Sequence, residues 1–250
     1  MTAHPLPYPD YLDAIARETG TFATAVAGAD PATPVPACPG WSLSQLTVHT
    51  GSVHRWFASL LAKDVQAPPS SREVDLELPI PDGGHANWLL TGQDKAHAVL
   101  AEVDPLHPMW TWGADPHARF WARRMLFETL VHRTDAEAAL SLPSDVDTRL
   151  AADGIDEFLV NLPHAASFAP EVVNLRGTGE IISFHSTDTD EHWHVQLRQD
   201  TFGLVPAGLA DTTVTAPAAD LLLFLYGRRD TTTVEGSRDL LTLWTANSAF

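Results

Sequence analysis

The chain has 250 residues, of which 44% are hydrophobic and 19% are charged, as in a folded globular protein of one or two domains. Its 32 acidic residues exceed its 15 Lys and Arg, and the net charge of -17 argues against nucleic-acid binding or attachment to anionic membranes, which need positive surface. One cysteine excludes internal disulfides and Cys-rich metal sites. The longest apolar run, residues 221–226, is far shorter than the roughly 20 residues of a membrane-spanning helix. The N-terminal residues show no basic region followed by an apolar one, so the sequence predicts a cytoplasmic protein.

Apolar residues at helical spacing dominate the first 140 residues. They predict four helices, at residues 8–27, 42–62, 88–103 and 119–140. The second has the clearest start, because Ser42 is a good N-cap and Gln45 follows three residues later, as in a capping box. Four helices with one or two long connections predict a four-helix bundle, to which we assign residues 1–145.

The pattern changes after residue 143. The remaining residues predict helices at 150–162, at 217–226 and from 237, and strands at 180–185, 192–196, 212–215 and 231–234. This mixture of helices and antiparallel strands predicts a small α+β domain over residues 146–250, so the fold class of the whole chain is α+β.

Two predicted helices of the bundle carry residues that could bind a metal. Glu128 and His132 are four apart, so both side chains project from one helix face, about 6 Å from each other. His49 lies on the apolar side of the second helix, where an unpaired imidazole would be costly. Together they offer three ligands to a divalent cation. This mixture of nitrogen and oxygen donors suits Zn²⁺ best, with Ni²⁺ or Fe²⁺ as alternatives. The open fourth position is typical of a catalytic zinc, and Asp135 is a candidate hydrogen-bond partner for a ligating imidazole.

Other interpretations of the histidines stay open. A Glu–His pair at this spacing is often a solvated pair or a plain hydrogen bond. His192 and His194 alternate on a predicted strand and share a face, as metal ligands can, but no third donor lies nearby in sequence, so we expect them to face solvent. Three further histidines are expected at the surface or in loops: His54, His97 and His117.

The single cysteine is not predicted to act as a nucleophile. Cys38 lies among prolines with no obvious base beside it, which favours an inert thiol. His49 follows eleven residues later, roughly 16 Å away if the intervening chain were all helical, so Cys38 is expected to be poorly placed to reach the metal. The sequence also has no phosphate-binding glycine loop, nucleophile elbow or HExxH motif.

Three segments resemble the mycothiol-dependent maleylpyruvate isomerase family. Residues 35–49 (VPACPGWSLSQLTVH), continued by VHRW at 53–56, look like its second-helix signature. Residues 127–137 (FETLVHRTDAE) look like its fourth-helix signature, and residues 216–229 (APAADLLLFLYGRR) are similar to its C-terminal domain. The motifs occur in the expected order and extend over nearly the whole chain.

The resemblance implies a DinB-like four-helix bundle followed by a small sterol-carrier-like α+β domain. It implies a zinc ion held by the positions that match His49, Glu128 and His132, and mycothiol, an actinobacterial thiol, as cofactor. It also implies that a basic residue of the C-terminal domain, Arg228 or Arg229, approaches the pocket. Fold alone does not determine the substrate.

The expected activity is therefore isomerisation of an activated cis-enoyl acid. A thiolate adds to the double bond, the new single bond rotates, and loss of the thiolate leaves the trans isomer. The expected partners are a small-molecule thiol and a small electrophilic or anionic substrate. Three alternatives stay open: a mycothiol S-transferase that leaves the adduct intact, metal-assisted hydrolysis, and a non-catalytic binding module whose metal is structural.

Overall fold

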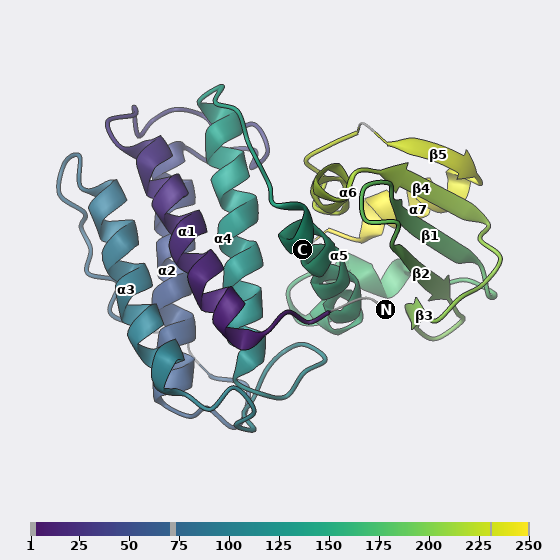
Figure 1. Cartoon of the computed structure of the whole chain (residues 1–250), viewed down its shortest axis with the longest axis horizontal. Helices are drawn as coiled ribbons and strands as arrows, with labels where there is room; N and C mark the ends of the chain where they lie inside the picture. The colour runs from purple at the N-terminus through teal and green to yellow at the C-terminus, as the bar shows by residue number, and fades with distance from the viewer. Residues whose placement is uncertain (1–3, 71–73, 231, 250) are drawn as a thin grey trace. The chain divides into compact units, whose positions relative to one another are not determined.

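The computed structural model of the chain describes residues 4–70, 74–230 and 232–249 (Figure 1). The chain divides into two compact units. The bundle unit comprises Leu6–Thr111 and Asp115–Asp145, and the sheet unit comprises the chain from Val146 onward with two short segments, residues 4–5 and Trp112–Ala114. The first is helical and the second combines helices with strands, so the predicted α+β class is confirmed.

The described part of the bundle unit contains four α-helices: α1 (Tyr8–Val26), α2 (Leu43–Ala62), α3 (His85–Glu102) and α4 (Arg119–Ala139). Helices α1 and α2 each pack against both α3 and α4. The capping box of α2 is present: Ser42 Oγ accepts a hydrogen bond from the Gln45 N–H (3.3 Å), and Gln45 Oε1 accepts one from the Ser42 N–H (2.8 Å). Helix α3 begins three residues earlier than predicted, because no capping side chain marks its start. Across the described residues, we find no helix with the length and apolar content needed to cross a membrane.

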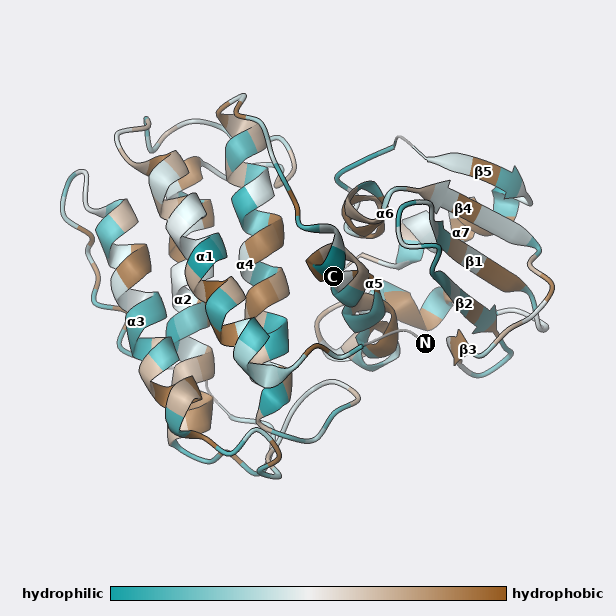
Figure 2. Ribbon diagram, in the orientation of Figure 1, coloured by the Kyte–Doolittle hydropathy of each residue, from teal (hydrophilic) through white to brown (hydrophobic). Residues whose placement is uncertain are grey.

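The core of the bundle is built from the apolar stripes of these helices, which alternate with hydrophilic bands along α1 and α4 (Figure 2). Phe22, Leu46 and Leu89, from three different helices, are all fully buried. Trp121 of α4 is also fully buried, and its ring lies 4.7 Å from that of Phe57 on α2. Burying side chains of this size stabilises the fold by about 1.5–3 kcal/mol each, so the packing of α2 against α4 is well determined.

The described residues of the sheet unit form a five-stranded sheet in the order β3-β2-β1-β4-β5. Its strands are β1 (Ile181–Ser186), β2 (His192–Leu197), β3 (Phe202–Val205), β4 (Thr212–Ala216) and β5 (Thr233–Gly236). Strand β1 is antiparallel to β2 and parallel to β4. The short strand β3 was not predicted, because Gly203 interrupts its four-residue pattern and only pairing with β2 defines it. Of the strand predicted at 231–234, Thr231 lies outside the described residues, and β5 extends instead to Gly236, whose φ of +95° favours glycine.

One face of this sheet forms the core of the unit. Phe184, Trp193 and Val214 point to that face and are buried, and Phe184 packs against Trp244, whose ring centroid is 5.2 Å away. The helical elements of the unit are α5 (Thr148–Asn161), the 3₁₀ helices η1 (Leu162–Ser167) and η2 (Pro170–Asn174), α6 (Ala218–Leu225) and α7 (Arg238–Asn247). Residues of the opposite face alternate with the core residues and are mostly polar, because successive side chains of a strand point to opposite sides.

Candidate metal centre

The three residues predicted to bind a metal lie together in the bundle unit. The Nε2 atom of His49 on α2 is 2.8 Å from Oε1 of Glu128 on α4, and His132 Nε2 is 3.3 Å from the same oxygen. The rings of His49 and His132 are perpendicular, with centroids 5.0 Å apart. One turn of α4 therefore supplies two donors, and the packing of α2 against α4 brings the third.

The spacing of these donor atoms is compatible with a metal ion. Ligand bonds of about 2.0–2.1 Å in a tetrahedral site place ligand atoms about 3.3–3.4 Å apart. The 3.3 Å separation of His132 and Glu128 already has this value, and the 2.8 Å separation of His49 and Glu128 would open by about half an ångström. The His49 side chain is 36% exposed, so the site is accessible from solvent. Two imidazoles and one carboxylate are the chemistry expected of a zinc site with one open position.

Asp135 orients one of the imidazoles. Its Oδ2 atom is 3.0 Å from Nδ1 of His132, and its side chain is almost completely buried. Hydrogen bonding at Nδ1 leaves Nε2, on the opposite side of the ring, directed toward Glu128. A carboxylate that accepts the second ring N–H of a ligating histidine fixes its tautomer and its orientation. The candidate role of Asp135 is thus supported by its position.

The electrostatics of the three donors are strongly coupled. Burial by itself lowers the pKa of His132, but hydrogen bonds with Asp135, Cys38 and Glu128 outweigh it and raise that pKa well above its usual value. Burial likewise favours protonation of Glu128, but hydrogen bonds with His132 and His49 hold its pKa well below the usual range. A cation is therefore favoured beside the Glu128 carboxylate, whether it is an imidazolium or a metal ion.

The structure contradicts the expectation that Cys38 lies far from this site. Its Sγ donates a hydrogen bond to Asp135 Oδ2 (3.5 Å), and ligand atoms of Cys38, His132 and Asp135 lie within 4.8 Å of one another. The expectation failed because the chain between Cys38 and α2 is not helical. The N–H of Val35 donates to the carbonyl of Trp41 (2.9 Å), so this loop folds back on itself and returns the thiol to α4. His132 consequently belongs to two overlapping groups of candidate ligands.

Trp41 is a neighbour of the site that sequence reasoning did not assign to it. Its ring lies 5.0 Å from that of His49 and 6.4 Å from that of His132. Trp41 also lines a surface hollow of about 410 Å³, together with Pro34, Pro39 and Gln45. The signal available in the sequence was its position directly before the N-cap of α2, which places it at the same end of the bundle as His49. Trp41 thus links the candidate metal centre to the adjacent hollow.

The three histidines expected at the surface or in loops differ in their burial. His54 was expected at the surface, but it is completely buried, and its Nε2 lies 2.7 Å from Thr129 Oγ1. It falls on the buried stripe of α2, four residues after Thr50 and three before Phe57, and burial lowers its pKa to about 4. His97 is exposed, as expected, and His117 is half-buried in the segment before α4. His54 is thus a neutral core residue.

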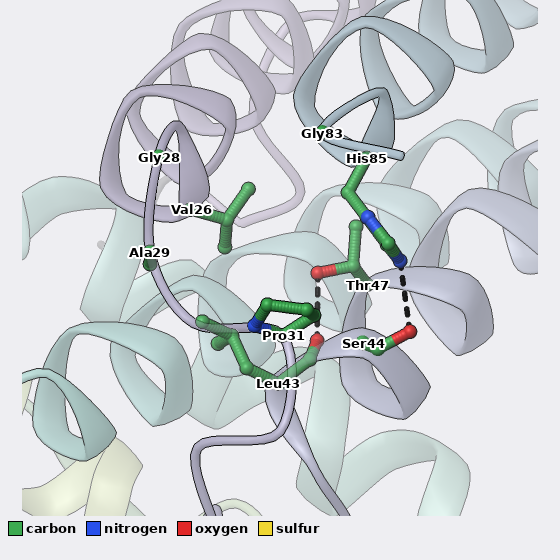
Figure 3. Close-up of a pocket in the computed structure, with 9 residues that line it drawn as sticks. All are labelled: Val26, Gly28, Ala29, Pro31, Leu43, Ser44, Thr47, Gly83 and His85. Carbon is green, nitrogen blue, oxygen red and sulfur yellow. Dashed lines mark hydrogen bonds between the residues drawn. The ribbon is translucent and has the colours of Figure 1, made fainter. Parts of the chain in front are cut away.

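A second cavity of the bundle unit is not lined by the predicted metal ligands. It has a volume of about 240 Å³ and is lined mainly by small and apolar side chains, among them Val26, Pro31 and Leu43 (Figure 3). Ser44 and His85 also line it and form a hydrogen bond of 2.8 Å between Oγ and Nε2.

The two arginines predicted to approach the pocket follow α6 in the sheet unit. That helix ends at Leu225, and the φ of +71° at Gly227 allows the N–H of Arg228 to donate to the carbonyl of Leu223 (2.7 Å). The Arg228 side chain donates from Nη1 to the carbonyl of Tyr226 (2.6 Å), and Arg229 Nη1 lies 3.4 Å from Asp220 Oδ1. Both guanidinium groups thus have local partners at the end of the helix.

Comparisons with known proteins identify the family and the fold of the chain. A family model described as the mycothiol maleylpyruvate isomerase N-terminal domain matches residues 12–137, and a second, described as the MDMPI C-terminal domain, matches residues 149–243. The crystal structure of the mycothiol-dependent maleylpyruvate isomerase superposes with a TM-score of 0.63 at 15% identity, covering 94% of this chain and 95% of that one. The structure of a mutant of that enzyme gives 0.64 at 14% identity with the same coverage.

The similarity to these two crystal structures supports the fold. No curated protein matches the sequence. The family assignment depends on the two family models, which together match most of the chain. The motifs around the predicted ligands lie within the first matched region, and the segment that ends with the two arginines lies within the second. The chain therefore belongs to the mycothiol-dependent maleylpyruvate isomerase family.

Proposed function

We propose that this protein is a metal- and mycothiol-dependent isomerase that converts an activated cis-enoyl acid, such as maleylpyruvate, into its trans isomer. The observation that carries the proposal is the convergence of His49, Glu128 and His132 on one partly exposed point of the bundle. Family membership supports the reaction class, and the open position supports a catalytic role for the site.

The residues of the site supply binding and orientation. His49, Glu128 and His132 would hold the metal, and Asp135 keeps the His132 ring turned so that Nε2 is available. A divalent ion with two neutral imidazoles and one carboxylate keeps a net charge of about +1, and when bound it lowers the pKa of a nearby thiol. No side chain of the protein has to act as the nucleophile, because mycothiol supplies the attacking sulfur.

The strongly acidic protein needs a positive centre for an anionic substrate, and we propose that Arg228 or Arg229 provides one in addition to the metal. Arg228→Ala or Arg229→Ala should then raise KM for the substrate and lower kcat/KM about 10- to 100-fold, the value of one charge-assisted hydrogen bond. Steady-state kinetics at saturating mycothiol would measure this. Arg198→Ala is the matched control, since Arg198 is an exposed arginine of the same unit. If all three variants show wild-type kinetics, neither arginine binds substrate.

Product identity tests the proposed function directly. The metal-loaded protein is incubated with mycothiol and maleylpyruvate, and the trans isomer is followed by NMR while adducts are followed by mass spectrometry. Catalytic formation of the isomer without a lasting adduct is the expected result. Accumulation of a mycothiol adduct would identify an S-transferase instead, and a hydrolysed product would identify a hydrolase. Binding without any turnover would identify a non-catalytic module.

A further inference from the structure

A second group of histidines lies on the polar face of the sheet. In the antiparallel pairing of β1 with β2, His185 is directly opposite His192, and Ser183 is opposite His194. Directly paired residues share a face, and so do residues two apart on one strand. The three imidazoles therefore occupy one face, opposite to that of Phe184 and Trp193.

His192 is exposed, as expected, and His194 is half-buried, but the pairing of the two strands brings further donors close to them in space. His185, on the neighbouring strand, provides one, and Asp190 of the turn between the strands provides another. Sequence separation hid His185, because its proximity depends on the register of the hairpin. Ligand atoms of His185, Asp190 and His192 lie within 4.8 Å of one another.

The rings form a parallel stack. The centroids of His185 and His192 are 4.0 Å apart with an angle of 5° between the rings, and those of His192 and His194 are 6.0 Å apart with an angle of 7°. Because a nitrogen lone pair lies in the plane of its ring, shared coordination requires a rotation of at least one ring. His192 is exposed and has room for that rotation.

Two nitrogen atoms of the stack lack hydrogen bonds. His185 Nε2 and His194 Nδ1 are buried atoms without a hydrogen-bond partner, and Asp190 Oδ1 is 3.5 Å from the former, beyond good hydrogen-bond geometry. A buried donor or acceptor left unpaired costs about 1–3 kcal/mol. A ligand that engages His185 Nε2 and the Asp190 carboxylate together would remove this cost.

We propose that His185, Asp190 and His192 form a second site, in the sheet unit, for a divalent transition metal, with His194 beside it. Two imidazoles and one carboxylate are donors that suit Zn²⁺, Ni²⁺ or Cu²⁺. Because of the ring rotation it requires, this site is expected to bind more weakly than the bundle site. It shares no residue with the proposed catalytic centre, so it stands or fails independently of the proposed function.

Metal stoichiometry of the full chain tests the site. Metal-free protein is equilibrated with excess Zn²⁺ by dialysis, and bound zinc is measured by elemental analysis. The wild type is expected to bind two ions, and His192→Ala and His185→Ala one each. His164→Ala, which removes an exposed histidine of the same unit, should still bind two. The difference between the wild type and His192→Ala is independent of the bundle site, so equal zinc contents of these two proteins would overturn the proposal.

A second measurement locates the ion. In the His132→Ala variant the bundle site has lost a ligand, so any remaining zinc belongs elsewhere. Titration of this variant with Zn²⁺ should shift the imidazole C–H signals of His185 and His192 in NMR spectra, while the signal of His164 stays unchanged. Unshifted signals for His185 and His192 at saturating zinc would also overturn the proposal.

Discussion

Replacing His132 with alanine should abolish stoichiometric metal binding in the bundle unit and reduce turnover to background while the fold stays intact. His132 supplies one of three ligands, and its Nε2 is 3.3 Å from Glu128 Oε1. Loss even of a residue that only orients a ligand weakens metal binding about 10- to 100-fold, and loss of the ligand itself should cost more. His192→Ala removes a ligand of the proposed site in the sheet unit. Elemental analysis of proteins that carry this substitution, with and without His132→Ala, therefore counts only the metal of the bundle site, and circular dichroism checks the fold.

The overlap of two candidate ligand groups makes a single variant insufficient. His132 belongs both to the group with His49 and Glu128 and to the group with Cys38 and Asp135. Glu128→Gln keeps the size of the side chain but removes its charge, and it should lose the metal. Cys38→Ser should retain it. The reverse result would move the metal to the Cys38 side of His132. His97→Ala, which removes an exposed histidine of α3, is the matched control.

Omission of mycothiol should remove turnover completely, whereas Cys38→Ser should keep most of it. The first expectation follows from the thiolate chemistry of the proposed reaction. The second follows from the orientation of the internal thiol, which hydrogen-bonds Asp135 on the Nδ1 side of His132, while Nε2 faces Glu128 on the other side of the ring. Serine retains a donor to Asp135, so this variant tests the sulfur alone. Initial rates with and without mycothiol provide the measurement.

The alternative outcomes have distinct meanings. Turnover without mycothiol in the wild type but not in Cys38→Ser would make Cys38 an internal nucleophile. Thiol-independent turnover in both proteins would reject thiolate chemistry and favour hydrolysis. Because Cys38 lies so near His132, this comparison is more informative than sequence spacing suggested.

The bundle and its candidate ligands were largely predictable from local patterns. Helical periodicity located α1, α2 and α4 to within a residue or two, and the Ser42–Gln45 capping box marked the start of α2. The i,i+4 spacing of Glu128 and His132 placed both on one face of α4. These features depend on neighbouring residues of one helix, so their physics is contained in a short stretch of sequence.

What the sequence determined by itself is therefore the presence of the four bundle helices, the capped start of α2 and the face that carries Glu128 and His132. Only the tertiary structure decided that Cys38 returns to α4, that His54 is buried and that His185 stacks on His192. Each of these depends on a loop path, a packing partner or a strand register. Such features are set by contacts between residues far apart in the chain, which no local periodicity records.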